Sequence, residues 1–534
     1  MPNNTSKQSG PSLDGSRTLQ LSIFSSRVSS IADEMGAVLR RAAFSANIKD
    51  RLDYSCAMFD PRGQLIAQAA HIPVHLGSMA FAMVDLVESH NWQDGDTLVL
   101  NDPFKGGTHL PDVTLVSPVF VEGQLAGFVA NRAHHADIGS EAPGSMPLSS
   151  SLLEEGVIIS PTLMAAKSKI LPEVFDRLTE KLGENSRGDF VAQWSANRRG
   201  IQRLQALIQT AGIENYLNQV DDLNTYAREL AKVYFGKLPR GNFKFQDYLD
   251  DDGQGTENIL LKTNVEISEG SILVDFKGSS AQVAGNLNCP LTVTVAAVLY
   301  VFRCLLPSDA PACHGLFQGI SVFAPQGSIL NADYPAAVAA GNVETSQRVV
   351  DLVLGALAAA LPDLIPAASQ GTMNNLAMGG VVDSENENDG KKWSYYETIC
   401  GGTGAHSLGE GLDATQSHMT NTLNTPIEVL ESNFPLRLRA YRLRSGSGGK
   451  GEYCGGEGVI REYEFLENTE VSLISERRTH QPWGLNGGGE ATTGANYLNG
   501  ENVGGKKHIS IKPGDRLRTE TPGGGGWGNP KGII

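Results

Sequence analysis

Two stretches of this chain concentrate the side chains that bind metal ions and move protons. Residues 101–112 read NDPFKGGTHLPD, and residues 130–137 read ANRAHHAD. Two imidazoles and one carboxylate form a set that binds Mn²⁺, Zn²⁺ or Fe²⁺ and leaves coordination positions open for water or substrate. The candidate metal ligands are His109, Asp112 and His134.

The spacing of these residues fits a β-hairpin that brings them together. We expect two strands on either side of a three-residue loop at 122–124. In that register Asp112 lies opposite His134, close enough for both to hold one ion. His109 then approaches from the adjoining loop, where Pro111 prevents regular structure. The alternative is that all three candidates are hydrogen-bonded core or turn residues.

Four further residues are candidates for catalytic contact with the substrate. His71 and His75 are spaced by one helical turn, but Pro73 between them predicts that His75 begins the following helix. His135 and Asp137 come directly after the last candidate ligand. The acid or base role of each residue stays unassigned, and a hydrogen-bonded structural histidine is the alternative for the first two.

A polar segment before an apolar helix offers groups for substrate binding. Residues 342–348, NVETSQR, resemble a helix start, where capping alone explains the threonine and serine. Glu344 and Arg348 are the candidates here, because a guanidinium can hold an anionic group. Two more polar runs, 396–402 and 421–428, suggest loops that converge on a cleft, although turn formation explains most of their composition.

Two glycine-rich motifs come close to nucleotide-binding signatures without completing them. Residues 446–451 match the GxGxxG spacing, but no helical pattern follows. Residues 500–506 resemble a phosphate-binding loop, yet Lys507 stands where a serine or threonine is required, and the pattern continues as a strand. We therefore expect no nucleotide site on this chain, and any ATP site to lie on a partner.

The elements that must position these residues predict an α+β (mixed α/β) fold with several lobes. Apolar residues at helical spacing predict a helix over 19–46, and residues 172–238 form a helical middle segment. After residue 428, short alternating runs between glycine clusters indicate a β-rich lobe. The expected division is a disordered tail at 1–17, an N-terminal α/β lobe with the metal site and the helical segment at 18–250, a central α/β lobe at 251–427 and a glycine-rich β lobe at 428–534.

Composition restricts the classes of function. Among 534 residues, 43 are Lys or Arg and 59 are Asp or Glu. The net charge of −16 argues against non-specific binding to nucleic acid or to anionic membranes. No apolar run reaches the length of a membrane span, and the six cysteines include no C-x-x-C pair. The first seventeen residues lack the apolar core of a secretory signal, which predicts a cytoplasmic protein.

Several motifs together resemble those of the hydantoinase B/oxoprolinase family. They are 53–60 (DYSCAMFD), 70–79 (AHIPVHLGSM), 101–112, 144–147 (GSMP), 155–157 (EGV), 341–346 (GNVETS) and 522–528 (PGGGGWG). The resemblance implies a B-type subunit of ATP-dependent enzymes that open cyclic amides, with the nucleotide site on a separate A-type subunit. From the metal-dependent carboxylase branch it also implies a divalent metal held by His109, Asp112 and His134.

The function expected from this resemblance is the opening of a lactam, hydantoin or similar small ring. Amide resonance stabilises the ring carbonyl and hydrolysis can be uphill, which explains coupling to ATP. The A-type partner phosphorylates the amide oxygen, and water then attacks at the metal site of this chain. Two alternatives are a subunit of an ATP-dependent ketone carboxylase and a noncatalytic assembly subunit. The sequence resembles one subunit rather than the fused oxoprolinase.

Overall fold

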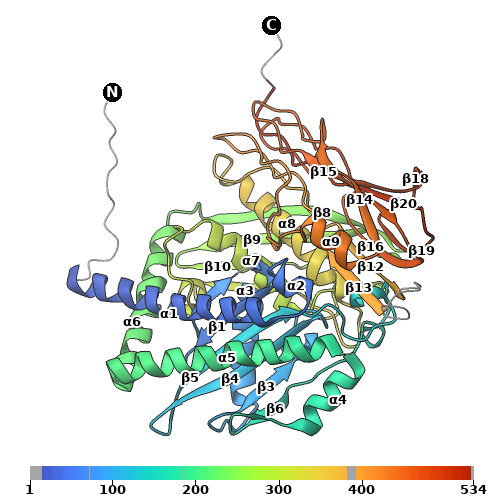
Figure 1. Cartoon of the computed structure of the whole chain (residues 1–534). Coiled ribbons are helices and arrows are strands. Elements are labelled where there is room, and N and C mark those ends of the chain that lie inside the picture. The colour runs from blue at the N-terminus through green and yellow to red at the C-terminus, as the bar shows by residue number, and fades with distance from the viewer. Residues whose placement is uncertain (1–14, 71, 183, 382–391, 531–534) are drawn as a thin grey trace.

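The computed structural model describes residues 15–70, 72–182, 184–381 and 392–530 (Figure 1). Helices and several β-sheets make up this part of the chain, which confirms the predicted α+β class. The predicted helical middle segment is also confirmed, as three consecutive helices: α4 (Pro172–Leu182), α5 (Glu184–Ala211) and α6 (Ile213–Phe235). None of the described helices combines the length and the apolar character needed to cross a membrane.

The chain enters the fold through α1 (Gly15–Ala42), and a break separates it from the short helix α2 (Ala46–Lys49). The tail predicted at 1–17 is therefore wrong for its last three residues, which already form the helix, while residues 1–14 lie outside the described part. A stripe of buried apolar side chains at helical spacing holds α1 against the fold. These side chains are Leu21, Phe24, Val28, Ile31, Met35 and Leu39.

The N-terminal lobe is built on a seven-stranded sheet with the order β2-β1-β5-β4-β3-β6-β7. Its strands are β1 Tyr54–Phe59, β2 Leu65–Ala70, β3 Thr97–Leu100, β4 Asp112–Val121, β5 Gln124–His134, β6 Thr162–Ala166 and β7 Lys169–Ile170. Neighbouring residues of a strand point to opposite faces. Met58 packs on the face that α1 covers, and there α1 and α5 run side by side (Figure 1). Phe59 packs on the other face, with Met83 of α3 (Pro73–Glu88). The sheet is thus covered on both faces.

The central lobe joins the first lobe through a helix pair. Its sheet has the order β11-β10-β9-β8. The elements are β8 Gly241–Asp251, β9 Glu257–Ser268, β10 Ser271–Asp275, α7 Leu291–Cys304, a short 3-10 turn His314–Phe317, β11 Ile320–Phe323, a π-helical turn Gly341–Thr345 and α8 Ser346–Ala358. The N-terminal lobe has three further 3-10 turns, at Pro103–Lys105, Pro143–Ser145 and Leu152–Glu154. α7 packs on α3, and a Cβ on Gly77 of α3 would lie 2.8 Å from the Cα of Ala296 on α7, so glycine allows the close approach.

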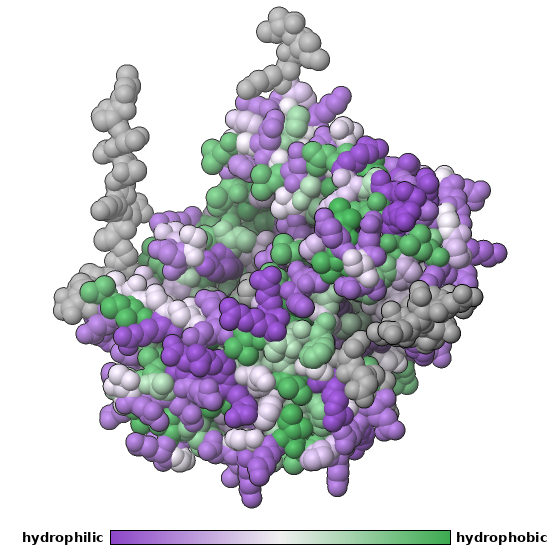
Figure 2. All heavy atoms as spheres, viewed as in Figure 1, coloured by the Kyte–Doolittle hydropathy of each residue, from purple (hydrophilic) through white to green (hydrophobic). Residues whose placement is uncertain are grey.

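Two further sheets form the C-terminal part, which confirms the predicted β-rich lobe. Their orders are β13-β12-β16-β19 and β14-β15-β20-β17-β18. The elements are β12 Asn375–Val381, β13 Lys392–Glu397, α9 Ile427–Asn433, β14 Leu436–Arg444, β15 Gly458–Phe465, β16 Thr469–Ile474, β17 Ala495–Leu498, β18 Glu501–Asn502, β19 Lys506–Ile511 and β20 Arg516–Glu520. β12 pairs with β16, so one sheet crosses the boundary predicted at residue 428. On the face of the molecule shown in Figure 2, hydrophilic and hydrophobic residues are interspersed over this part.

The glycine-rich segments of this part pack backbone against backbone. The N–H of Gly449 donates to the carbonyl of Gly524 at 2.9 Å. A Cβ on Gly524 would lie 1.9 Å from the carbonyl oxygen of Thr403, so no larger residue fits there. The strand β15 follows the first glycine motif, and Lys506 of the second begins the strand β19. Both motifs therefore lack the helix that a phosphate-binding loop precedes.

Candidate metal centre

The hairpin of β4 and β5 places Asp112 directly opposite His134, as predicted. Its turn is tighter than the predicted three-residue loop, because only Glu122 and Gly123 separate the paired strand ends. Both have positive φ, 51° and 79°, as a two-residue hairpin turn requires. This turn alone would shift the pairing by one residue, but a bulge in β5 at Ala126 restores it. The predicted register is confirmed although the predicted loop is wrong.

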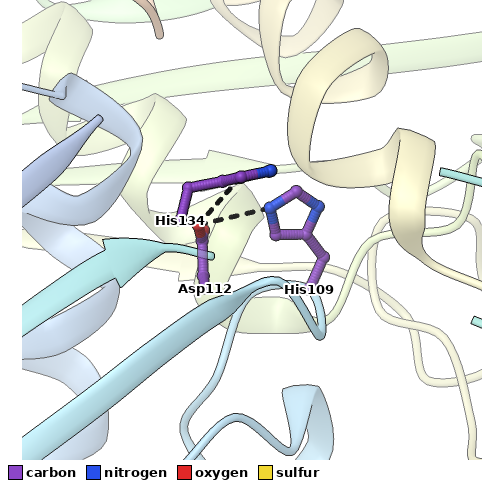
Figure 3. Close-up of side chains that lie close together, drawn as sticks. All are labelled: His109, Asp112 and His134. Carbon is purple, nitrogen blue, oxygen red and sulfur yellow. Dashed lines mark ion pairs between the residues drawn. The ribbon is translucent and has the colours of Figure 1, made fainter. Parts of the chain in front are cut away.

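Asp112 is the centre of a cluster of imidazoles (Figure 3). Its Oδ1 lies 3.3 Å from Nε2 of His109 and 3.4 Å from Nδ1 of His134. Its Oδ2 lies 3.2 Å from Nε2 of His75 and accepts a 2.7 Å hydrogen bond from the hydroxyl of Thr108. One atom from each of His109, Asp112 and His134 lies within 4.8 Å of the other two. This spacing fits the ligands of a single ion.

The three predicted ligands bury polar atoms that have no hydrogen-bond partner. Their side chains are only 0%, 1% and 3% exposed for His109, Asp112 and His134. Within the described structure, Nε2 of both histidines and Oδ1 of Asp112 make no hydrogen bond. Nε2 of His109 and Oδ1 of Asp112 share only their 3.3 Å ion-pair contact, and Nε2 of His134 has no hydrogen-bond partner among the described residues. A buried polar atom costs about 1–3 kcal/mol when left unpaired. The donor set fits a divalent Mn, Zn or Fe ion, which would supply the missing partner, better than an all-oxygen Ca²⁺ site.

The electrostatics of the cluster favour a cation. Burial raises the pKa of Asp112, but the charges of His109 and His75 and the close contacts of its carboxylate with the imidazoles outweigh burial and hold that pKa well below its ordinary value. Burial lowers the pKa of His134. Burial also acts to lower the pKa of His109, but the neighbouring Asp112 carboxylate raises it overall. The cluster therefore combines a carboxylate with a neutral imidazole, the forms that bind metals.

His75 lies in the first turn of α3, which begins at Pro73, two residues before the predicted start. Its Nδ1 lies 3.2 Å from the hydroxyl of Ser55 on β1, and this contact turns Nε2 toward Asp112. His75 thus orients the central carboxylate, as residues next to metal ligands commonly do. The other predicted histidine of this segment, His71, lies outside the described residues.

Three residues that the sequence did not single out complete the surroundings. The ring of Tyr396 on β13 stacks on His134, with centroids 4.9 Å apart and planes 9° apart. Asp53, just before β1, places Oδ2 4.0 Å from Nδ1 of His134. Asn342 in the π-helical turn donates to Oδ2 of Asp112 at 3.4 Å. All three lie within segments noted in the sequence, but only tertiary contacts show which side chain of each segment reaches the cluster.

A narrow cavity of about 20 Å³ opens beside the cluster, with room for about one water molecule. Its walls come from the N-terminal lobe, the central lobe and the C-terminal part, and the two polar runs 396–402 and 421–428 do converge on it. The residues that line it are Asp53, Ile72, Val74, His75, Asp112, His134, Asn342, Val343, Met373, Tyr396, Thr398, Met419, Thr420 and Thr422.

The structure does not bring His135 and Asp137 to this cavity. His135 follows the last residue of β5, and its ring packs against Phe190 of α5, with centroids 4.7 Å apart. Its Nε2 contacts Oε1 of Gln193 on α5 at 2.9 Å. Asp137 accepts a 2.7 Å hydrogen bond from the hydroxyl of Ser145, which stabilises a local turn. Both residues therefore have structural contacts in place of the predicted contact with the substrate.

Arg348 and Glu344 also lie outside the cavity lining. Arg348 is fully buried, with Nη1 3.6 Å from Asp247 and Nη2 3.4 Å from Glu476. The sequence suggested that its charge binds an anionic group of the substrate, but in the structure that charge pairs with these two carboxylates. Glu344 accepts a 3.0 Å hydrogen bond from the N–H of Met373, and burial raises the pKa of Glu344 to about 8.

Comparison with known proteins shows the family to which the chain belongs. Residues 17–530 match the family model described as hydantoinase B/oxoprolinase. The chain belongs to the hydantoinase B/oxoprolinase family.

Curated proteins of the hydantoinase B/oxoprolinase type are similar over nearly the whole chain. The 5-oxoprolinase of Dictyostelium discoideum is 40% identical over 534 residues, which cover 97% of this chain and 41% of that protein. The 5-oxoprolinase of Saccharomyces cerevisiae is 39% identical and is covered to 43%. This chain thus spans about two fifths of the length of these relatives. A protein of a Pseudomonas species, described as a putative B-type component of a D-/L-hydantoinase, is 30% identical, with 94% of this chain and 88% of that protein covered.

Two solved structures share the hydantoinase B fold. The ATP-dependent caprolactamase of Pseudomonas jessenii superposes with a TM-score of 0.89 at 24% identity, over 97% of this chain and 92% of that chain. An acetone carboxylase superposes with a TM-score of 0.87 at 17% identity, over 96% of this chain and 76% of that chain. At these identities the likeness concerns the fold alone.

Proposed function

We propose that this chain is the B-type component of an ATP-dependent cyclic amide hydrolase, which opens a lactam ring after an A-type partner has phosphorylated the amide. The observation that carries the proposal is the buried cluster of His109, Asp112 and His134, in which one ligand atom of each residue makes no hydrogen bond. The relatives named 5-oxoprolinase and the hydantoinase relative support a cyclic amide as the substrate.

The residues of the cluster have separable tasks in this proposal. His109, Asp112 and His134 would hold a divalent Mn, Zn or Fe ion. Such an ion, when bound, polarises a carbonyl and activates water. Thr108 and His75 fix the Asp112 carboxylate through its second oxygen, and the stacked ring of Tyr396 fixes the imidazole of His134.

The ATP-dependent step belongs to the partner in this proposal. Neither glycine-rich motif of this chain precedes a helix, so neither presents a helix N-terminus to phosphate. A phosphorylated amide is reactive and must reach the cluster without escaping to solvent. The A-type partner therefore docks through a large, partly apolar interface. We place the reaction in the cytoplasm, where ATP is available.

Product analysis tests this proposal. The chain is copurified with its A-type partner and incubated with ATP and, separately, with lactams, hydantoins, or ketones plus bicarbonate. A ring-opened amino acid formed together with ADP supports the proposal. A carboxylated ketone would assign the chain to a carboxylase instead. If an intact, metal-loaded complex forms neither product, the chain is assigned a noncatalytic assembly role and the proposal is contradicted.

A further inference from the structure

Arg51 is a fully buried cation whose hydrogen-bond partners are all neutral. Its Nη1 donates to the carbonyl of Tyr396 at 2.9 Å and to Oδ1 of Asn47 at 3.3 Å. Its Nη2 donates to the hydroxyls of Thr398 at 3.1 Å and Thr422 at 3.4 Å. Its Nε has no partner, and it forms no ion pair with any carboxylate of the described residues. The ring of Tyr396, with its centroid 4.9 Å from Cζ of Arg51, gives the charge a cation–π contact but no counter-charge. A buried charge without a counter-charge is costly, so an anion near Arg51 would be stabilised.

Other buried arginines of this chain have carboxylate partners or a full set of hydrogen bonds. Arg348, Arg461 and Arg477 each pair with a buried carboxylate. Arg132 has no such partner, but its three guanidinium nitrogens all donate hydrogen bonds, and none of the acceptors lines the cavity. Only Arg51, among these five, touches side chains of the cavity wall.

Three threonines connect Arg51 to the cavity. Thr398, Thr420 and Thr422 all line it, and their hydroxyl oxygens lie 2.7 Å apart for Thr398 and Thr422 and 3.4 Å apart for Thr420 and Thr422. A guanidinium only donates, so the two threonines that contact Arg51 accept from it and keep their own protons to donate. The two contacts between threonines use two of the three hydroxyl protons. The third proton is therefore available to donate a hydrogen bond to a molecule in the cavity.

We propose that Thr398, Thr420 and Thr422, backed by the charge of Arg51, bind an oxyanion of the substrate beside the metal cluster. This inference rests on the proposed function and narrows its substrate class to lactams that carry a carboxylate, with the phosphoryl group added to the amide as the other source of an oxyanion. His134 and Asp112 line the same cavity, so one small molecule meets both the threonines and the cluster.

Charge and wall composition agree with this assignment. Asp53 and Asp112 are the carboxylates in the lining, and a divalent ion on the cluster offsets both. The charge of Arg51 then remains as an attraction for an anion. The cavity must widen to admit a ring, and two of its walls are Met373 and Met419, whose unbranched side chains change conformation readily.

Binding without ATP tests the assignment. The metal-loaded full-length protein, with its partner if one copurifies, is titrated calorimetrically with 5-oxoproline, with 2-pyrrolidinone, which is the same ring without the carboxylate, and with inorganic phosphate. Thr422→Val removes one hydroxyl at nearly constant volume, and Thr398→Val serves as the second variant. The matched control is Thr425→Val, a similarly buried threonine of the same segment that does not line the cavity.

The expected result is that 5-oxoproline binds, and that Thr422→Val and Thr398→Val each weaken its binding about 10- to 100-fold, the size of a hydrogen bond to a charged group. Binding of 2-pyrrolidinone should be equally weak in all variants. Binding of phosphate alone, with the same dependence on the threonines, would support the oxyanion site and assign it to the phosphoryl group. Equal loss for the charged and the neutral ring, or binding of neither anion, would overturn the assignment. Because no turnover is measured, failure here leaves the ring-opening assay of the proposed function unaffected.

Discussion

Replacement of Asp112 by asparagine tests the cluster at its centre. The carboxylate lies 3.2–3.4 Å from nitrogens of His75, His109 and His134. Asparagine keeps the volume but removes the charge, and removal of one member of a buried ion pair costs about 3–5 kcal/mol. The cluster holds the pKa of Asp112 well below its ordinary value, so the carboxylate's part of this stabilisation is complete above about pH 4 and is lost as the pH falls through the lowered pKa. The part that comes from the raised pKa of His109 is lost as the pH rises through that pKa.

Urea denaturation of the metal-free proteins at pH 7 measures the effect. We expect Asp112→Asn to be less stable than the parent by about 3–5 kcal/mol. Mn²⁺ or Zn²⁺ at one hundred times its Kd should stabilise the parent by about 2.7 kcal/mol, and the variant far less. The control Asp96→Asn, at a buried aspartate 3.3 Å from His90, should keep the full stabilisation by metal. A loss below about 1 kcal/mol in Asp112→Asn, with equal stabilisation of both proteins by metal, would refute the reasoning.

Three more outcomes are expected. The purified single chain should not hydrolyse ATP, and saturable turnover that Lys506→Ala abolishes would contradict this. Size-exclusion chromatography with light scattering should show a stable hetero-oligomer with an A-type partner as the active species, whereas activity in a peak of this chain alone would exclude it. Glu344, with its pKa raised by burial to about 8, keeps a proton that the unfolded chain releases above about pH 4.5. Stability should therefore fall from about pH 4.5 to 8, by up to about 5 kcal/mol, and urea titrations at several pH values should show a flatter profile for Glu344→Gln.

The sequence predicted the parts of the site that follow from local spacing. Proline favours the first turn of a helix, so Pro73 predicted a helix start near His75, and α3 begins at Pro73 with His75 in its first turn. The sequence also predicted that Asp112 faces His134, although it missed both the shorter turn and the bulge at Ala126. These two features shift the pairing by one residue in opposite directions, so their effects on the register cancel. Such a bulge has no clear signal in a strand of apolar residues.

The parts that could not be predicted depend on partners distant in sequence. Arg348 resembles a substrate-binding residue until Glu476, 128 residues further along, is seen to pair with it. No sequence pattern marked Arg51 as a candidate, because its contacts are with Thr398 and Thr422, which lie 347 and 371 residues away. The boundary placed at residue 428 followed composition, whereas strand pairing between β12 and β16 joins both sides of it.

Metal analysis of the purified protein tests the central claim most directly. Elemental analysis combined with anomalous diffraction should show about one divalent ion per chain, bound by His109, Asp112 and His134. His134→Ala should lose this ion together with ATP-coupled product formation, while His90→Ala, at a partly exposed histidine paired with Asp96 outside the cavity, should retain it. A protein without stoichiometric metal, or an ion bound elsewhere with these three side chains unligated, would contradict the account.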